Sequence, residues 1–145
     1  MSIRKATLQD LDSLTELFDL YRIFYRQDSN VGAARNFIEE RLRKEDSVIF
    51  IAYEGDSAVG FVQLYPSFSS VSMKRLWILN DLYVTFSGRG KGFGDRLIKE
   101  TIAYAEQTGA KGILLETEKE NIPAQKLYEK IGFHKETNHF YFFSL

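Results

Sequence analysis

Residues 77–109 constrain the possible folds of this chain more than any other stretch. An apolar segment, Trp77 to Val84, leads into a glycine-rich turn and then into an amphipathic run that ends at Gly109. Glycine accepts positive φ values, and without a Cβ it lets a ligand approach the backbone closely. The glycines stand at alternate positions, at Gly88, Gly90, Gly92 and Gly94. The pattern therefore predicts a strand, a glycine-rich turn whose backbone can take positive φ, and the amino terminus of a helix.

This turn is suited to binding an anion. The first N–H groups of a helix have no partner within the helix, and the helix dipole places partial positive charge at the same end. Arg89 and Lys91 add formal positive charge. We therefore expect a phosphate or pyrophosphate on the N–H groups of Arg89 to Gly94. An ordinary flexible loop between strand and helix is the alternative.

Two common glycine fingerprints do not fit the turn. The P-loop pattern G-x-x-x-x-G-K-[ST] fails because Lys91 is followed by Gly92 and not by Ser or Thr. The dinucleotide pattern G-x-G-x-x-G would end on Phe93 or Asp95. The spacing that fits is Arg-x-x-Gly-x-Gly, formed by Arg89, Gly92 and Gly94. After a strand that ends in Leu-Tyr-Val, this spacing resembles the acetyl-CoA signature of the GNAT N-acetyltransferase superfamily.

The composition limits the classes of protein to be considered. With 145 residues, 44% hydrophobic and 27% charged, the chain has the size and balance of one soluble domain, which we assign to residues 1–145. A net charge of −1 argues against nucleic-acid binding, and no apolar run is long enough to span a membrane. From Ile3 onward charged and apolar residues alternate, so we expect no signal peptide. Cysteine is absent, which excludes thiolate metal sites and favours a cytoplasmic location.

Hydrophobic periodicity predicts an α/β fold with elements in the order β-α-α-β-β-β-α-β-α-β-β. Residues 77–84 would lie in the middle of a mixed sheet. Pro66 and the serine-rich tract after it predict a loop before Lys74. Strands are expected at 2–6, 48–53, 58–65, 77–84 and 111–117, with one or two more in 133–145, and helices at 7–25, 33–44, from the glycine turn to 109, and at 121–131.

A second motif strengthens the resemblance. Within Glu120 to Phe133, Asn121 is followed three residues later by Ala124, then by Leu-Tyr at Tyr128 and by Gly-Phe at the end. This arrangement is similar to the downstream motif of the GNAT superfamily, and the two motifs together cover about half of the chain. The segment WILNDLYV, the serine-rich tract and the aromatic carboxyl end look most like the branch of polyamine and histone-type amine acetyltransferases.

The resemblance implies a fold, a reaction and a cofactor site. The fold would be a single domain with a mostly antiparallel sheet flanked by helices. The reaction would be direct transfer of an acetyl group from acetyl-CoA to a primary amine in a ternary complex. The pantetheine arm would pair with the main chain of Leu82 and Val84, the N–H of Leu82 would bind the carbonyl oxygen, and Tyr128 would protonate the departing thiolate. The matching cofactor-binding positions are Leu82, Tyr83, Val84, Arg89, Gly90, Lys91, Gly92, Phe93, Gly94, Asn121, Ala124 and Tyr128.

The general base is not fixed by the motifs. In the polyamine branch a glutamate often stands at the place of Asn80, which cannot accept a proton. Asp81 is the next candidate, but it points to the opposite face of a regular strand unless a β-bulge re-aims it. Glu116 and Glu118 could act through water, and each of these carboxylates could equally be a surface group. We expect acceptor contacts from Asn80, Glu116 and Glu118, and from Tyr25 if it lines the cleft and is not simply core.

The acceptor is a polyamine, amino acid, aminoglycoside or lysine by this interpretation. No metal, nucleic acid or membrane partner is expected, and a homodimer is allowed for. A second class of function also fits the motifs, namely a regulatory protein that binds acetyl-CoA without turnover. The missing glutamate at Asn80 favours it, whereas Tyr128 argues against it.

Overall fold

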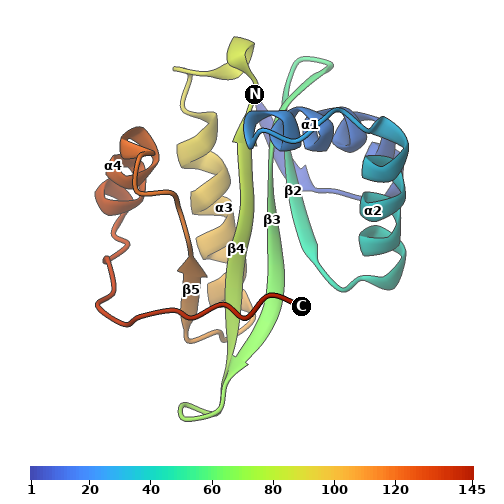
Figure 1. The fold of residues 1–145 in the computed structure, drawn as a ribbon. Helices are drawn as coiled ribbons and strands as arrows, with labels where there is room; N and C mark the ends of the chain where they lie inside the picture. The colour runs from blue at the N-terminus through green and yellow to red at the C-terminus, as the bar shows by residue number, and fades with distance from the viewer.

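One five-stranded sheet forms the centre of the computed structural model, which describes residues 1–145 (Figure 1). The strands lie side by side in the order of the sequence. The first four pair antiparallel, and the fifth pairs parallel with the fourth. They are β1 (Ser2–Lys5), β2 (Val48–Glu54), β3 (Ser57–Ser69), β4 (Lys74–Val84) and β5 (Gly112–Leu115). The α/β class and the mixed, mostly antiparallel sheet are thus confirmed.

Helices cover both faces of the sheet (Figure 1). The first two pack on one face, where Leu14 and Ile38 join Ile51 and Phe61 in a buried cluster. The third packs on the other face with a second cluster and connects β4 to β5, as a parallel pair requires. The α-helices are α1 (Leu11–Phe24), α2 (Val31–Lys44), α3 (Phe93–Gln107) and α4 (Ile122–Ile131), with short 3₁₀ turns η1 (Leu8–Asp10) and η2 (Phe86–Gly88). None of these helices is long and apolar enough to cross a bilayer.

Local capping explains where the helices begin. The Thr7 hydroxyl accepts from the N–H of Gln9, and the Asp10 carboxylate accepts from the N–H of Thr7, which completes a capping box. Asn30 and Asn121 cap α2 and α4 through hydrogen bonds from main-chain N–H groups three residues later. The helix starts expected at Thr7 and Asn121 are therefore confirmed, and α2 begins two residues earlier than periodicity indicated.

The loop predicted around Pro66 is wrong. β3 continues through Pro66 to Ser69 and pairs with β4 from Gly60 to Ser69, so that the strands form a long hairpin. β2 pairs with β3 only as far as Leu64, which leaves the far part of β3 as an edge. A proline is tolerated on an edge strand because its missing N–H faces no partner.

The one or two strands predicted in 133–145 are also absent. The chain forms no strand after β5, and its last residues cross the front of the sheet from α4 towards β3 (Figure 1). The apolar run from Phe140 to Phe143 has the composition of a strand, but a strand needs a partner that runs beside it. Here the segment lies across the strands, and its four aromatic side chains are 71–94% exposed.

Candidate active site

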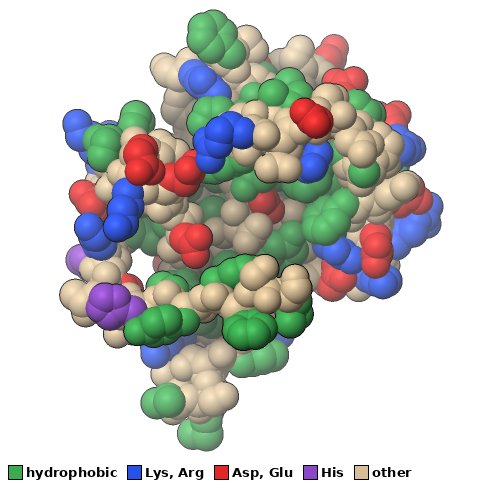
Figure 2. All heavy atoms as spheres, in the orientation of Figure 1, with side chains coloured by type: hydrophobic (Ala, Val, Ile, Leu, Met, Phe, Trp, Pro, Cys, Tyr) green, Lys and Arg blue, Asp and Glu red, His purple; other side chains and the backbone are tan.

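The site lies where β4 and β5 separate. The two strands pair only from Leu76 with Gly112 to Leu79 with Leu115, whereas β4 continues to Val84. A cavity of about 440 Å³ opens beside this point, on the side of α1. Figure 2 shows the hollow between α1 and the carboxyl-terminal segment, with acidic side chains in and beside it. The four residues expected to contact the acceptor, Tyr25, Asn80, Glu116 and Glu118, all line this cavity.

The open stretch of β4 directs main-chain groups into the gap. Thr85 donates its N–H to the carbonyl of Val59, so residues 81, 83 and 85 face β3. Hydrogen-bonded and non-bonded pairs alternate in an antiparallel ladder, so the main-chain N–H and C=O groups of Leu82 and Val84 point away from β3. Their N–H groups therefore face the side from which β5 has departed. The main chain of Tyr83 is directed at β3, and its ring packs against Tyr21 and Phe24 of α1.

The glycine turn has the predicted backbone at two of its four glycines. Gly90 and Gly92 have φ of 77° and 85°, and Gly92 is the N-cap of α3, with no side chain closing the helix end. Gly94 is already helical. Gly88 is buried, and a Cβ there would lie 3.1 Å from Val59 and Val84, so close packing is what requires glycine. Of the four positions where glycine allows positive φ, the turn uses Gly90 and Gly92 for it and not Gly88 or Gly94.

The two cations of the turn differ in their contacts. Lys91 forms an ion pair with Glu54, with Nζ 3.0 Å from Oε1. The Nε of Arg89 donates to the carbonyl of Val84 at 3.2 Å, which ties the turn to the end of β4. Its guanidinium group lies 5.8 Å from the centre of the Phe24 ring. The positive charge of Arg89 is therefore not neutralised by any carboxylate, whereas Glu54 partly neutralises that of Lys91.

A β-bulge brings Asp81 to the side of the cavity. Gln63 pairs with Asp81 and Leu64 with Leu79, so Asn80 is an extra residue on β4. Leu79 and Leu82 consequently both pack on the α3 face, although positions three apart on a regular strand would face opposite sides. Asp81 is turned towards the α1 face, where Tyr21 and Gln63 lie near it. The structure thus supplies the bulge on which the role of Asp81 depended.

Asp81 is a buried carboxyl with only neutral hydrogen-bond donors. It is 4% exposed and accepts from Nε2 of Gln63 at 2.8 Å and from Nδ2 of Asn80 at 3.1 Å. The Ser47 hydroxyl donates to Oε1 of Gln63 at 2.8 Å, which fixes the orientation of that amide. Burial raises the pKa of Asp81, and the donors, with the hydroxyl of Tyr21 nearby, offset only part of this rise.

Aromatic rings form the wall between Asp81 and the cavity. The Tyr21 ring packs edge-on against Tyr25, with 5.1 Å between centroids, and its hydroxyl donates to the carbonyl of Asn80 at 3.5 Å. Burial and the charge of Asp81 raise the pKa of Tyr21. Burial also raises the pKa of Tyr25, and Glu118 adds to it. Tyr25 is half-buried at the rim, so it serves both as packing and as cavity lining.

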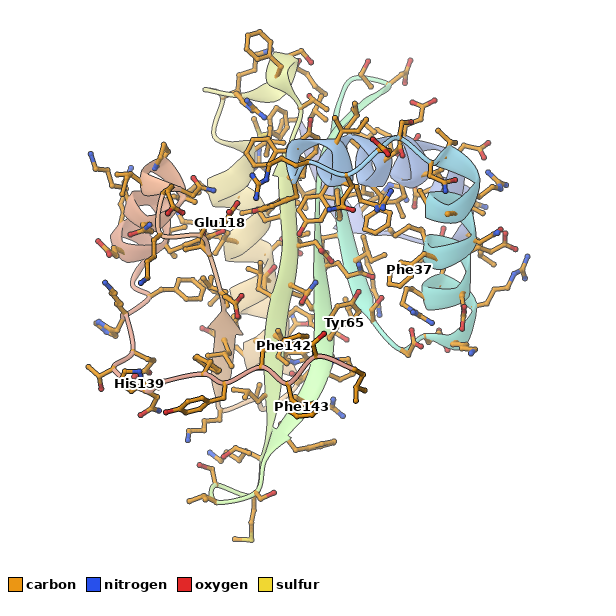
Figure 3. All side chains as sticks on the ribbon, viewed as in Figure 1. Phe37, Tyr65, Glu118, His139, Phe142 and Phe143 are labelled. Carbon is orange, nitrogen blue, oxygen red and sulfur yellow. The ribbon has the colours of Figure 1, made fainter.

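An ion pair closes one end of the cavity. Nη2 of Arg26 lies 3.1 Å from Oε2 of Glu118, which joins the end of α1 to the loop after β5. In Figure 3 Glu118 lies between that loop and α1. Both side chains are largely exposed, so the pair adds little to stability. Glu118 is thereby a compensated carboxylate, whereas no ion pair engages Glu116.

Tyr128 lies on the inner side of α4. Its ring centroid is 5.9 Å from that of Phe133, and the N–H of Phe133 donates to the carbonyl of Tyr128 at 3.0 Å. Burial raises the pKa of Tyr128 to about 12, and Tyr25 adds to the effect, so the phenol keeps its proton at neutral pH. At the start of α4, Asn121 and Ala124 bond to each other as a helix cap.

The family can be assigned from comparison with known proteins. Residues 12–133 match the model of the Acetyltransferase (GNAT) family. The chain belongs to this GNAT family. It is 48% identical over 137 residues to Uncharacterized N-acetyltransferase YhfO of Bacillus subtilis (strain 168), with 94% of this chain and 92% of that protein covered. The chain is therefore an N-acetyltransferase.

Solved structures of GNAT proteins share the fold. The crystal structure of a probable acetyltransferase is 43% identical, with a TM-score of 0.92 over 100% of this chain and 97% of the other. Aminoglycoside N-acetyltransferase AAC(6')-Iy, solved in complex with CoA, has a TM-score of 0.83 at 21% identity, over 99% of this chain and 93% of its own. The second likeness establishes the fold alone.

The residues present fit the acetyl-CoA that GNAT enzymes use. Gly90 and Gly92 have positive φ, and a Cβ added at either would meet no protein atom within 4 Å, so the turn has room for a ligand against its backbone. The uncapped N–H groups at the start of α3 adjoin this space. Leu82 and Val84 direct unpaired N–H groups into the gap between β4 and β5.

Two residues of the GNAT site were missed by sequence analysis. Gln63, which is fully buried, holds Asp81, and Phe140 of the carboxyl-terminal segment lines the cavity. Gln63 carried a signal, since it is the one polar side chain in the run Val59–Leu64 and a buried amide needs partners. Phe140 carried none, because its position depends on how the carboxyl-terminal segment crosses the sheet.

We expect Gly92→Val to weaken CoA binding at least about tenfold, or 1.4 kcal/mol. A valine is strained at a φ of 85°, and its side chain would project into the space beside the first N–H groups of α3. Isothermal titration calorimetry with CoA measures the effect. Gly109→Val is the matched control, because Gly109 has φ of 70° and an equally open surrounding at the far end of α3. Equal CoA affinities for the two folded variants would contradict the assignment.

Proposed function

We propose that the chain transfers the acetyl group of acetyl-CoA directly to the primary amine of a cationic small molecule or of a lysine. The observation that carries this proposal is the open stretch of β4, where the N–H of Leu82 faces the gap left by β5. The cavity lined by Asn80 adjoins this gap, and Asp81 lies behind the aromatic wall of that cavity. The proposed proton acceptor, Asp81, and the proposed oxyanion donor, Leu82, are consecutive residues of one strand.

The bound cofactor would supply the acetyl group as an activated thioester. For its phosphates, the chain offers the N–H groups of residues 90–94 and the guanidinium of Arg89. The N–H groups of Leu82 and Val84 would pair with the pantetheine arm as they would with a neighbouring strand. The ion pair of Lys91 with Glu54 makes Lys91 a weaker contributor than its position in the motif implies. Tyr83, Asn121 and Ala124 would act through packing or helix capping.

Three groups of the chain would act on protons and charge. Asp81 would accept the proton of the attacking amine, with the hydroxyl of Tyr21 between its carboxylate and the cavity. Leu82 would donate its N–H to the oxygen that gains negative charge, a contact worth about 3 kcal/mol in comparable sites. Tyr128 would hold a proton for the departing sulfur, since its pKa near 12 keeps the phenol neutral.

The cavity suits a cationic acceptor. Glu116 brings negative charge to its rim, and Glu118 adds less because it is paired with Arg26. Tyr21 and Tyr25 present ring surface to an ammonium group. The proteins compared above name no polyamine or histone acceptor, and a likeness at 21% identity to an aminoglycoside enzyme carries no argument about substrate. The proposal therefore names the acceptor by charge and by its primary amine.

A regulatory protein without turnover is the weaker alternative. The argument for this alternative was that Asn80 stands where the polyamine branch often has a glutamate, so that a general base would be missing. The bulge at Asn80 supplies Asp81 to the same side of the sheet, and the relative that spans nearly the whole chain is named as an N-acetyltransferase. We also propose a cytoplasmic location, supported by the absence of cysteine, and a homodimeric state.

The reaction is tested by CoA release from acetyl-CoA with a panel of polyamines, amino acids, aminoglycosides and lysine peptides. We expect release with at least one cationic amine, and initial-rate lines that intersect, because no cysteine is present to form an acyl-enzyme. Parallel lines, or enzyme acetylated before the amine is added, would show a covalent route and contradict direct transfer. If no amine of the panel gave CoA release, the proposed class of acceptor would be contradicted.

Asp81→Asn should lower kcat/KM by about 10² to 10⁴ and abolish the acidic limb of its pH profile. In the native enzyme the activity should rise with pH through the raised pKa of Asp81, because the base must be ionised. A carboxyl with a raised folded-state pKa favours the folded state at low pH and loses this contribution as pH rises through that pKa. The Asn variant should consequently be at least as heat-stable as the native chain near neutral pH.

Glu116→Gln and Glu118→Gln are the matched comparisons for Asp81. Each removes one carboxylate from the cavity rim, so we expect a higher KM for a cationic amine and an unchanged acidic limb. An acidic limb that disappears in either of these variants, and persists in Asp81→Asn, would move the role of base away from Asp81.

Tyr128→Phe should lower the single-turnover rate by about 10² to 10⁴ and alter the basic limb of the pH profile. The ring and its packing against Phe133 remain, so the melting temperature and the CoA dissociation constant should change little. Single-turnover measurements are needed because slow product release would mask the loss in steady state. A native single-turnover rate in this variant would reduce Tyr128 to a packing residue.

A further inference from the structure

A second cavity lies at the end of the sheet where β1 ends and β2 begins. Its volume is about 720 Å³, which is larger than that of the cavity beside Asn80. This volume lies within the range of small-molecule sites, about 300–1,000 Å³. Half of its lining residues are hydrophobic, and the two cavities share no residue. The second cavity is therefore separate from the site proposed for acetyl transfer.

Two cations of this cavity, Lys5 and Arg75, have no acidic partner. Neither side chain forms an ion pair or a hydrogen bond within the chain, and each lies against an aromatic ring. Nζ of Lys5 is 5.5 Å from the centre of the Tyr104 ring, and Cζ of Arg75 is 5.2 Å from the centre of the Trp77 ring. A ring attracts a cation through its π electrons and leaves the N–H groups free to donate. The donors of both cations are thus available to a ligand.

The two rings join the cations into one wall of the cavity. Trp77 and Tyr104 are packed together, with 5.4 Å between their centroids. Nε1 of Trp77 donates to Oγ1 of Thr108 at 2.9 Å, which fixes the indole and uses its only donor. The polar groups that this wall offers to a ligand are therefore those of Lys5 and Arg75.

The cations are not needed to neutralise the carboxyl end of α3, which adjoins the cavity. The N–H groups of Thr108, Gly109 and Ala110 each donate to a carbonyl of its last turn at 3.1 Å, so the helix end is already capped. Glu45 is the one carboxylate of the lining, and it is exposed to water. The cavity therefore has an excess of positive charge, whereas the cavity beside Asn80 carries the carboxylates of Glu116 and Glu118.

We propose that this cavity binds a small aromatic carboxylate. The carboxylate group would accept hydrogen bonds from Arg75 and Lys5, since a guanidinium can donate two parallel bonds to one carboxylate. The aromatic ring would pack on Tyr104 and on the ring of Pro66. Pro66 and Trp77 pair across β3 and β4, so their side chains lie on the same face of the sheet.

The single tryptophan of the chain reports on binding at this cavity. Trp77 lines the cavity, and its indole N–H gives one resonance in a heteronuclear NMR spectrum. We expect naphthoate to shift this resonance to saturation. Naphthylmethylamine, which has the same ring system and the opposite charge, should produce no saturable shift. Saturating CoA should leave the affinity for naphthoate unchanged, because the cavity lies apart from the cofactor-binding positions.

Three outcomes of the titration would overturn the proposal. The first is a Trp77 resonance that does not respond to naphthoate. The second is an equal response to naphthylmethylamine, which would show that the cations do not select the ligand. The third is competition by CoA, which would place naphthoate in the cofactor site. None of these measurements needs turnover, so their result is independent of the proposed acetyl transfer.

Substitutions identify the donors. Arg75→Gln should weaken naphthoate binding at least about tenfold, because the carboxylate loses a charged, two-pronged donor. Lys5→Gln should weaken it at least about threefold, since one charged donor is lost. Lys74→Gln is the matched control, because it removes the same charge from an exposed neighbour outside the cavity, and the affinity should stay within about twofold.

The CoA affinity of each variant, measured by calorimetry, establishes that it is folded. Naphthoate binding that survives both Arg75→Gln and Lys5→Gln would overturn the proposal. So would an equal loss in Lys74→Gln, since it would show that only the overall charge of the chain matters.

Discussion

The loss of a neighbour for β4 beyond Leu79 is the constraint on which the rest of the site depends. Up to that residue β4 is paired on both sides, and after it β5 turns away. An unpaired strand side in the interior would be costly, because each free N–H and C=O group must find water or a ligand. Here the strand side opens on a cavity, so its polar groups are available for recognition. The glycine turn follows at once, and the N–H groups of α3 continue the same line of donors.

The bulge at Asn80 sets the orientation of the site as much as the gap does. With a regular ladder, Asp81 would lie on the same face as Leu79, among the apolar side chains under α3, where an unpaired carboxyl could not be accommodated. One extra residue turns it instead towards Gln63 and Tyr21. Ser47, just before β2, then orients Gln63 of β3, so the carboxyl of Asp81 is held by a chain of hydrogen bonds that crosses neighbouring strands. A polar chain of this kind specifies a single side-chain arrangement because every member needs its partner.

Local sequence was sufficient for the parts of the molecule that depend on neighbours in the chain. The caps at Thr7 and Asn121, and the positive φ at Gly90 and Gly92, follow from residue type and spacing. The prediction of a loop at Pro66 was wrong because a proline can stand in β3 once β2 no longer pairs with it. Where β2 ends cannot be read from the residues around Pro66. Asp81 could be given a role only on condition of a bulge, since register is a property of two strands. The strands expected after Phe133 failed for the same reason, because an apolar run forms a strand only beside another one.

Charge separates the two ends of the open strand. At its far end Arg89, freed from any carboxylate, stands with the helix dipole of α3, and this end suits phosphate. At its near end Glu116, which no ion pair engages, gives the cavity rim a negative charge, which suits an ammonium group. The ion pair of Lys91 with Glu54 removes a cation that would otherwise spread positive potential around the turn. A small net charge therefore hides two opposite local fields along β4. Each would bind one substrate, and Leu82, which lies between them, is where the two would meet.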